Sequence, residues 1–232
     1  MRLDKFLCFT KNLSRKDAKE AVKKKRIQVN GAVVSDPGLV IKEGTDVVTY
    51  DGEQLIYEEF VYYMLNKPAG VVSATKDNVS KTVIELIDTE RENLFPVGRL
   101  DKDTVGFLII TDDGALSHHL TSPRHHIDKT YFVRSKSTLS KEDFERIEKG
   151  IELEDGVITK PGHIEKVSDK EYLLTISEGM FHEVKRIFFA LDNEVLYLKR
   201  IKIGNVILDE TLKEGEYRRL TEEELSELKG ND

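Results

Sequence analysis

The sequence has almost no cysteine and no long apolar run. Its 232 residues include one cysteine, Cys8, and no tryptophan. One cysteine can form neither an internal disulfide nor a thiolate metal site, so a reducing compartment is expected. Apolar runs are only a few residues long, far below the roughly 20 residues that a membrane-spanning helix needs. Residues 1–5 include an acid and precede no long apolar stretch, which argues against a signal peptide.

Several catalytic motifs are missing as well. The sequence contains no glycine-rich phosphate loop, dinucleotide fingerprint or serine elbow. His118-His119 and His125-His126 resemble metal-ligand pairs, but adjacent side chains diverge on a strand and lie about 100° apart on a helix. Because no cysteine or suitably spaced acid accompanies them, they do not predict a zinc site. We therefore expect no metal site.

Charge is distributed unevenly along the chain. The formal net charge is −7, yet residues 1–35 hold ten Lys/Arg against three Asp/Glu, a net charge of +7. The remainder carries −14. A basic segment ahead of an acidic body is typical of a module that binds a polyanion, although a merely solvated helix face has the same composition.

The N-terminal residues predict a small α+β module. A helix is expected from Arg2 to about Leu13, and a second over 15–25 with Ser14 as its N-cap. Asn30-Gly31 between two short apolar alternations predicts a hairpin turn. Residues 51–55 predict a turn and a linker.

The rest of the chain predicts a second domain. We place the boundary so that the domains span residues 1–56 and 57–232. Strands and helices alternate there without a regular βαβ order, so the expected α+β fold has a mixed, mainly antiparallel sheet with flanking helices. A short helix is expected over 81–88, and a strand over 60–65 that breaks at residues 66–70.

Residues 97–106 are the first candidate for a reactive site. They place Asp101 near Arg99 in a turn between two glycines, directly ahead of an apolar run over 107–110. Glycine lets the backbone approach a substrate, and a strand behind the turn makes it rigid. A solvated ion pair in a surface turn fits the same residues, so this motif alone does not decide between the two interpretations.

Three N-terminal motifs resemble the S4-type RNA-binding domain. They span residues 1–7, 14–18 and 26–31, and so include the hairpin turn. The resemblance implies a basic helix surface that grips structured RNA through its phosphates and shape. The expected RNA contacts are Arg2, Lys5, Ser14, Arg15, Lys16, Lys19, Lys23, Arg26 and Asn30, with Lys67 from the second domain.

Four later motifs resemble, in the same order, those of the RsuA-type pseudouridine synthases. They span residues 66–70, 98–101, 129–131 and 178–186, and the resemblance extends from about Phe60 to the end of the chain. It implies the pseudouridine synthase fold and accounts for an S4-type domain in front. Two positions depart from the family pattern: Met180 replaces a residue that is often basic, and Glu183 replaces one that is usually glutamine.

The resemblance implies isomerisation of uridine to pseudouridine in ribosomal RNA without a cofactor. The uracil N1–C1′ bond breaks, the base turns, and it rejoins the ribose through C5. Asp101 would act as the nucleophile at C1′, at C6 or through a glycal, with Lys185 as its cationic partner across a cleft. Tyr131 would stack on the uracil and is a candidate acceptor of the C5 proton. Arg99 would hold the RNA around the flipped nucleotide.

The sequence leaves alternatives open for the RNA substrate and for the class of function. The short chain without a long charged tail favours small-subunit rRNA, and large-subunit rRNA is the alternative. A non-catalytic ribosome-assembly factor would lack the three residues that this chain retains at Asp101, Tyr131 and Lys185. A glycosidase needs a second carboxylate across a sugar, and nothing in the sequence places Asp103 there. We expect a cytoplasmic monomer whose partner is ribosomal RNA or an assembly intermediate, without membrane contact.

Overall fold

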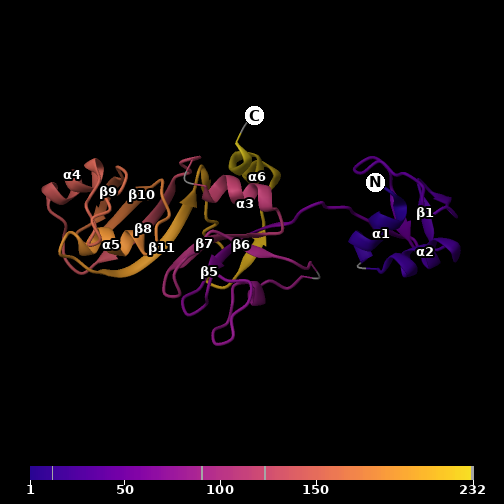
Figure 1. Cartoon of the computed structure of the whole chain (residues 1–232), viewed down its shortest axis with the longest axis horizontal. Helices are drawn as coiled ribbons and strands as arrows, with labels where there is room; N and C mark the ends of the chain where they lie inside the picture. The colour runs from indigo at the N-terminus through magenta and orange to yellow at the C-terminus, as the bar shows by residue number, and fades with distance from the viewer. Residues whose placement is uncertain (12, 90, 123, 231–232) are drawn as a thin grey trace. The chain divides into compact units, whose positions relative to one another are not determined.

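The chain forms two compact units in the computed structural model, Met1–Glu59 and Phe60–Asp232 (Figure 1). The structure describes every residue except 12, 90, 123, 231 and 232. The division follows Glu59, whereas the sequence placed the boundary after residue 56. Each unit combines helices with a sheet around its own buried apolar residues, which confirms the expected α+β class.

The N-terminal unit packs two helices on a four-stranded antiparallel sheet of order β2-β1-β3-β4. Its elements are α1 (Leu3–Lys11), α2 (Arg15–Lys23), β1 (Ile27–Val29), β2 (Ala32–Val33), β3 (Val48–Tyr50) and β4 (Glu53–Leu55). The Ser14 hydroxyl accepts a hydrogen bond from Asp17 N–H at 3.1 Å, which confirms the predicted N-cap. Leu3, Leu7 and Val22 from the helices meet Ile27 of the sheet in the core.

One expectation for this unit is wrong. Residues 53–55 are strand β4 rather than part of a linker. Asp51 and Gly52 both adopt positive φ angles, 49° and 86°, which turn the chain back so that Gln54 pairs with Thr49. The turn therefore closes the sheet instead of ending it.

The second unit is built on a nine-stranded mixed sheet of order β13-β5-β7-β11-β8-β10-β9, with β6 paired to β7 and β12 to β11. The strands β7 and β11 run parallel, while the other described pairs are antiparallel, as expected. The elements are β5 (Tyr62–Lys67), the 3-10 helix η1 (Ile84–Leu86), β6 (Phe95–Val97), β7 (Val105–Thr111), α3 (Gly114–Thr121), β8 (Lys129–Ser135), α4 (Lys141–Lys149), β9 (His163–Ser168), β10 (Glu171–Ile176), α5 (Glu183–Phe189), β11 (Val195–Ile203), β12 (Val206–Ile207), β13 (Tyr217–Arg219) and α6 (Glu222–Lys229).

Two local expectations in this unit are also wrong. Strand β5 continues through Lys67 because that residue still pairs with Gly106 of β7, so the break comes only at Pro68. The helix expected over 81–88 is a single 3-10 turn. The backbone of this segment hydrogen-bonds to Val72 instead of forming helical i→i+4 bonds, with Val72 N–H donating to Lys81 O and Val83 N–H donating to Val72 O.

Strand β7 is buried along its whole length and faces two apolar clusters. Phe107 and Ile109 lie in the cluster that includes residues of α3 and α6. Leu108 and Ile110 lie in the cluster that includes residues of α4 and α5. Successive side chains of a strand point to opposite faces, so this strand joins the two halves of the core and anchors the loop that precedes it.

A glycine is required where β7 meets β11. Gly106 lies opposite Arg200 in the parallel register and has a φ of +102°. A Cβ atom at this position would lie 2.2 Å from the Arg200 carbonyl oxygen. The close approach of two backbones thus depends on the missing side chain.

Gly106→Ala is expected to destabilise the second unit by roughly 2–4 kcal/mol, because it combines overpacking with an unfavourable φ. Urea unfolding followed by circular dichroism measures the change. Gly114→Ala is the control, since a Cβ atom there meets nothing within 4 Å. Equal stability of the two variants would contradict the prediction.

Candidate active site

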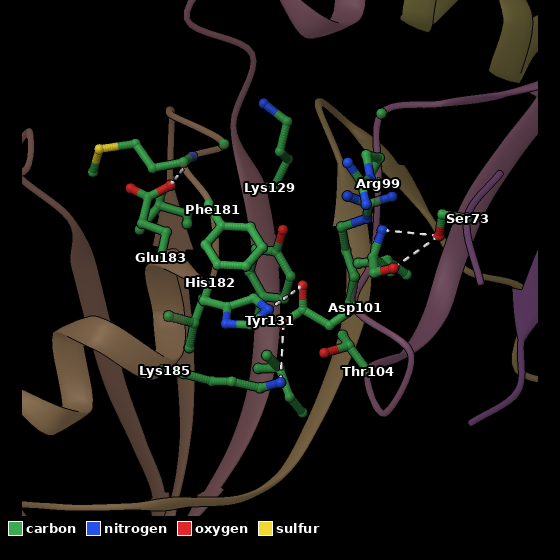
Figure 2. A pocket seen from close by; sticks show the side chains of 18 of the residues that line it. Ser73, Arg99, Asp101, Thr104, Lys129, Tyr131, Phe181, His182, Glu183 and Lys185 are labelled. Carbon is green, nitrogen blue, oxygen red and sulfur yellow. Dashed lines mark hydrogen bonds and ion pairs between the residues drawn. The ribbon is translucent and has the colours of Figure 1, made fainter. Parts of the chain in front are cut away.

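A cavity of about 530 Å³ collects residues from distant parts of the second unit. The loop of residues 98–104, called here the Asp101 loop, forms one side. Strand β8 contributes Lys129 and Tyr131, the start of α5 contributes Lys185, and β11 contributes Arg200. Figure 2 shows Asp101 and Lys185 pointing toward each other, with Tyr131 beside Asp101.

The Asp101 carboxylate has two nitrogen neighbours. Its Oδ2 lies 3.0 Å from Lys185 Nζ, so the expected ion pair is present. Its Oδ1 lies 3.4 Å from His182 Nε2, a contact that the sequence analysis did not anticipate. Arg99 is exposed and, within the described part of the chain, forms no ion pair with Asp101. The side chain of Asp101 is thereby directed toward α5.

Lys185 is shared between two carboxylates. Its ammonium also donates a hydrogen bond of 2.6 Å to Asp103 Oδ1. Burial lowers the pKa of Lys185, but hydrogen bonds to Asp103 and Asp101 outweigh it and leave that pKa above its usual value. Burial raises the pKa of Asp103, but the hydrogen bond from Lys185 and its charge outweigh burial and leave the pKa of Asp103 below its usual value. Lys185 is therefore a fixed cation at neutral pH.

The sequence analysis missed Asp103 as a partner of Lys185. The available signal was its spacing of two residues from Asp101 inside a tight turn. Thr104 N–H donates to Asp101 O at 3.1 Å, which curls the backbone so that both carboxylates reach one ammonium.

Lys67 holds the Asp101 loop from beneath. Its side chain has no exposed area, and Nζ donates to the carbonyl oxygens of Pro68 (3.0 Å), Asp101 (3.0 Å) and Thr104 (2.9 Å). The expectation that Lys67 contacts RNA is wrong, because strand β5 directs the side chain into the protein. Burial lowers the pKa of Lys67 to about 8, opposed by Asp103 and Asp101, so the amine remains protonated at neutral pH.

Ser73 fixes the same loop from a second direction. Its hydroxyl donates to Leu100 O at 2.8 Å and accepts from Leu100 N–H at 3.0 Å. Gly70 N–H donates to Lys102 O at 2.7 Å. With Lys67, these bonds satisfy backbone groups on both sides of Asp101 and limit how far the loop can move.

Tyr131 and Arg200 form a wall of the cavity. They are directly paired between β8 and β11, and both are nearly fully buried. Arg200 Nε donates to Phe107 O at 2.8 Å, whereas its Nη2 has no hydrogen-bond partner among the described residues. Nothing in the local sequence separates Arg200 from its basic neighbours on the same strand, so the sequence analysis did not select it.

Glu183 is a buried acid at the edge of the cavity. Its Oε2 accepts from Met180 N–H at 3.0 Å, and burial raises its pKa to about 7. Lys129 also lines the cavity, and its ammonium donates to Ile127 O at 2.8 Å. Burial, assisted by the charge of Arg200, lowers the pKa of Lys129.

The residues expected to bind RNA in the N-terminal unit are all exposed. Several are nevertheless engaged within that unit. Arg2 donates to Asp4, Arg26 pairs with Asp51, and the Asn30 side chain donates to Asp46 and accepts from Val47. The remaining exposed cations on α2 are Arg15, Lys16, Lys19 and Lys23.

Neither a metal centre nor a membrane span was found where the structure describes the chain. No cluster of three or more His, Cys, Asp or Glu there is arranged to hold a metal ion. No described helix is both long and apolar enough to cross a bilayer. His119 and His125 do approach each other, with ring centroids 4.7 Å apart, but no acid joins them in such a cluster.

Comparison with known proteins gives a consistent result for both units. Residues 61–190 match the RNA pseudouridylate synthase family, and residues 1–47 match the S4 domain. A crystal structure of a pseudouridylate synthase superposes with a TM-score of 0.70 at 40% identity, covering 98% of this chain and 99% of the other.

Curated relatives match over nearly their full length. An RNA pseudouridine synthase of Bacillus subtilis is 47% identical, with 97% of each chain covered. Ribosomal small subunit pseudouridine synthase A of Vibrio cholerae is 42% identical, with 98% of this chain and 99% of the relative covered. The Escherichia coli protein of the same name is 41% identical, with 98% and 100% covered.

Lys67→Met is expected to destabilise the second unit by roughly 2–3 kcal/mol. Methionine fills a similar volume but leaves the carbonyl oxygens of Pro68, Asp101 and Thr104 without the ammonium that donates to them. Urea unfolding measures the loss, and Lys76→Met, at an exposed position, is the matched control. If both variants unfolded at the same urea concentration, the clamping role of Lys67 would be refuted.

Glu183→Gln is expected to stabilise the protein at pH 8 and to have little effect at pH 5. The folded pKa of about 7 exceeds the ordinary 4.5, so the folded protein binds a proton that the unfolded chain releases. This contribution is complete below pH 4.5 and is lost as the pH rises through 7. Glutamine keeps the acceptor and cannot ionise, which should add on the order of 2 kcal/mol at pH 8. Urea unfolding at both pH values tests this, and a pH-independent difference would count against it.

Proposed function

The chain belongs to the RNA pseudouridylate synthase family, and we propose that it converts a uridine of small-subunit ribosomal RNA to pseudouridine with Asp101 as the nucleophile. The observation that carries this proposal is the position of the Asp101 carboxylate, 3.0 Å from the Lys185 ammonium in a cavity that Tyr131 also lines. The relatives named ribosomal small subunit pseudouridine synthase A support the choice of rRNA.

In the proposed reaction, a uridine leaves its stack and enters the cavity beside Asp101. The Lys185 ammonium pairs with the Asp101 carboxylate and holds it in the cavity, where it acts as the nucleophile. Asp101 attacks the ribose C1′ or the base C6, or assists glycal formation, and the N1–C1′ bond breaks. The uracil turns, C5 bonds to C1′ as any bond to Asp101 breaks, the C5 proton is removed, and N1 takes up a proton. No group beyond these side chains is required.

Tyr131 and Arg99 have separate proposed roles. Tyr131, 7% exposed on β8, offers a ring face deep in the cavity on which the uracil packs, and its hydroxyl is the proposed acceptor of the C5 proton. Arg99 is exposed on the Asp101 loop and is free of Asp101, which suits contact with a phosphate. This arrangement favours an enzyme over a non-catalytic assembly factor.

The N-terminal unit supplies the proposed grip on structured RNA. Its exposed α2 cations, Arg15, Lys16, Lys19 and Lys23, present charge to phosphates while the buried face of the helix stays in the core. Since the proposed substrate is ribosomal RNA or an assembly intermediate, we place the enzyme in the cytoplasm. We propose that it acts as a monomer, because the RNA offers enough binding surface for a single copy of the chain.

Asp101→Asn should reduce pseudouridine formation by at least about 10³-fold, because an amide is not a nucleophile. RNA affinity should stay near that of the wild type. Asp103→Asn is the matched control: it touches the same Lys185 from the solvent side and should retain activity within about tenfold.

The assay uses transcribed small-subunit and large-subunit rRNA, with pseudouridine mapped at single-nucleotide resolution. Activity on the small-subunit transcript alone supports the full proposal. Activity on the large-subunit transcript alone would overturn the choice of rRNA, and activity of Asp101→Asn equal to wild type would overturn the assignment of the nucleophile.

A further inference from the structure

An exposed aromatic ring lies at the rim of the active-site cavity. Phe181 is 72% exposed and lines the cavity just ahead of α5. Phe189, at the other end of that helix, is similarly exposed at 67% but does not line the cavity. Leaving a phenylalanine ring in water costs hydrophobic stabilisation, so its location at the cavity is the feature to explain.

The Phe181 ring is held in place by its neighbour. It stacks on the His182 ring with centroids 3.7 Å apart and planes 19° from parallel. His182 has left-handed backbone angles, φ 52° and ψ 28°, and its Nε2 lies 3.4 Å from Asp101 Oδ1. Figure 2 shows the two rings together beside Asp101 and Tyr131. One face of Phe181 is thus covered by His182, while most of the ring remains open.

The surroundings indicate what covers the open part of the ring. The lining of the cavity has more cations than acids, which suits a polyanion and not an apolar peptide. The cations are Arg99, Lys102, Lys129, Lys185 and Arg200, and the acids are Asp101 and Glu183. A flat ring beside such charges matches the stacking platforms of proteins that bind single-stranded RNA. We propose that Phe181, backed by His182, stacks on a nucleobase of the substrate RNA adjacent to the flipped uridine.

Depth distinguishes this base from the target uracil. Tyr131 is 7% exposed within the cavity, where the proposed reaction places the uracil, whereas Phe181 is 72% exposed at its opening. A ring at the opening of the cavity contacts the part of the RNA strand that stays outside the cavity. The inference rests on the proposed function, because it requires RNA in the cavity.

The test compares four variants on whichever rRNA transcript the wild type modifies: Phe181→Ala, Phe181→Leu, Phe181→Trp and Phe189→Ala. Phe181→Ala and Phe181→Leu should raise KM, and weaken binding measured in the Asp101→Asn background, by about tenfold. Phe181→Trp should stay within about threefold of wild type because it restores a planar ring. Phe189→Ala should match wild type, and kcat at saturating RNA should change by less than about threefold in all four.

Three results would overturn the inference. Wild-type behaviour of Phe181→Leu would show an apolar contact without stacking. An equal loss in Phe189→Ala would show a general surface effect. A fall in kcat with unchanged binding would mean that the ring only holds His182 and Asp101. If the wild type modifies neither transcript, the proposed function itself fails, which is a separate outcome from a failure confined to the Phe181 variants.

Discussion

The active site depends on one buried ammonium group. Lys67 has no exposed area, and a buried charge is tolerated only where polar groups surround it. The carbonyls of Pro68, Asp101 and Thr104 supply those groups, so the loop must curl over the amine. The side chain of Asp101 points toward α5, where it meets Lys185. The carbonyl oxygens that surround the Lys67 ammonium therefore also fix the position of the Asp101 carboxylate.

The second constraint is the balance of charge above this loop. Two carboxylates, Asp101 and Asp103, face one ammonium, Lys185. Asp103 is the more exposed partner, so solvent screens its interaction more than that of Asp101. His182 contacts the other carboxylate oxygen of Asp101, and its ring stacks on that of Phe181 at the cavity rim. The same short segment therefore orients the carboxylate and shapes the entrance.

Sheet topology brings these groups together. The parallel contact of β7 with β11 places the end of the Asp101 loop beside Arg200. Strand β8 pairs with β11 on its other side, so that Tyr131 lies opposite Arg200. Gly106 allows this approach, since any Cβ atom would collide with the Arg200 carbonyl. Residues more than 80 positions apart along the chain, such as Asp103 and Lys185, thereby share one cavity.

Local patterns in the sequence determined much of this protein. The N-cap at Ser14 and the apolar strand β7 were predictable, because each depends on residues close in the chain. The irregular order of strands and helices predicted the mixed sheet. The motifs also named Asp101, Tyr131 and Lys185 before any geometry was known. Burial and long-range partners were decided only by the tertiary structure. In the sequence Lys67 resembles an exposed cation, and only the folded chain shows that carbonyls of the Asp101 loop enclose its amine. Folding also brings Asp103, His182 and Arg200 to the site, because contacts between distant segments leave no periodic pattern in either of them.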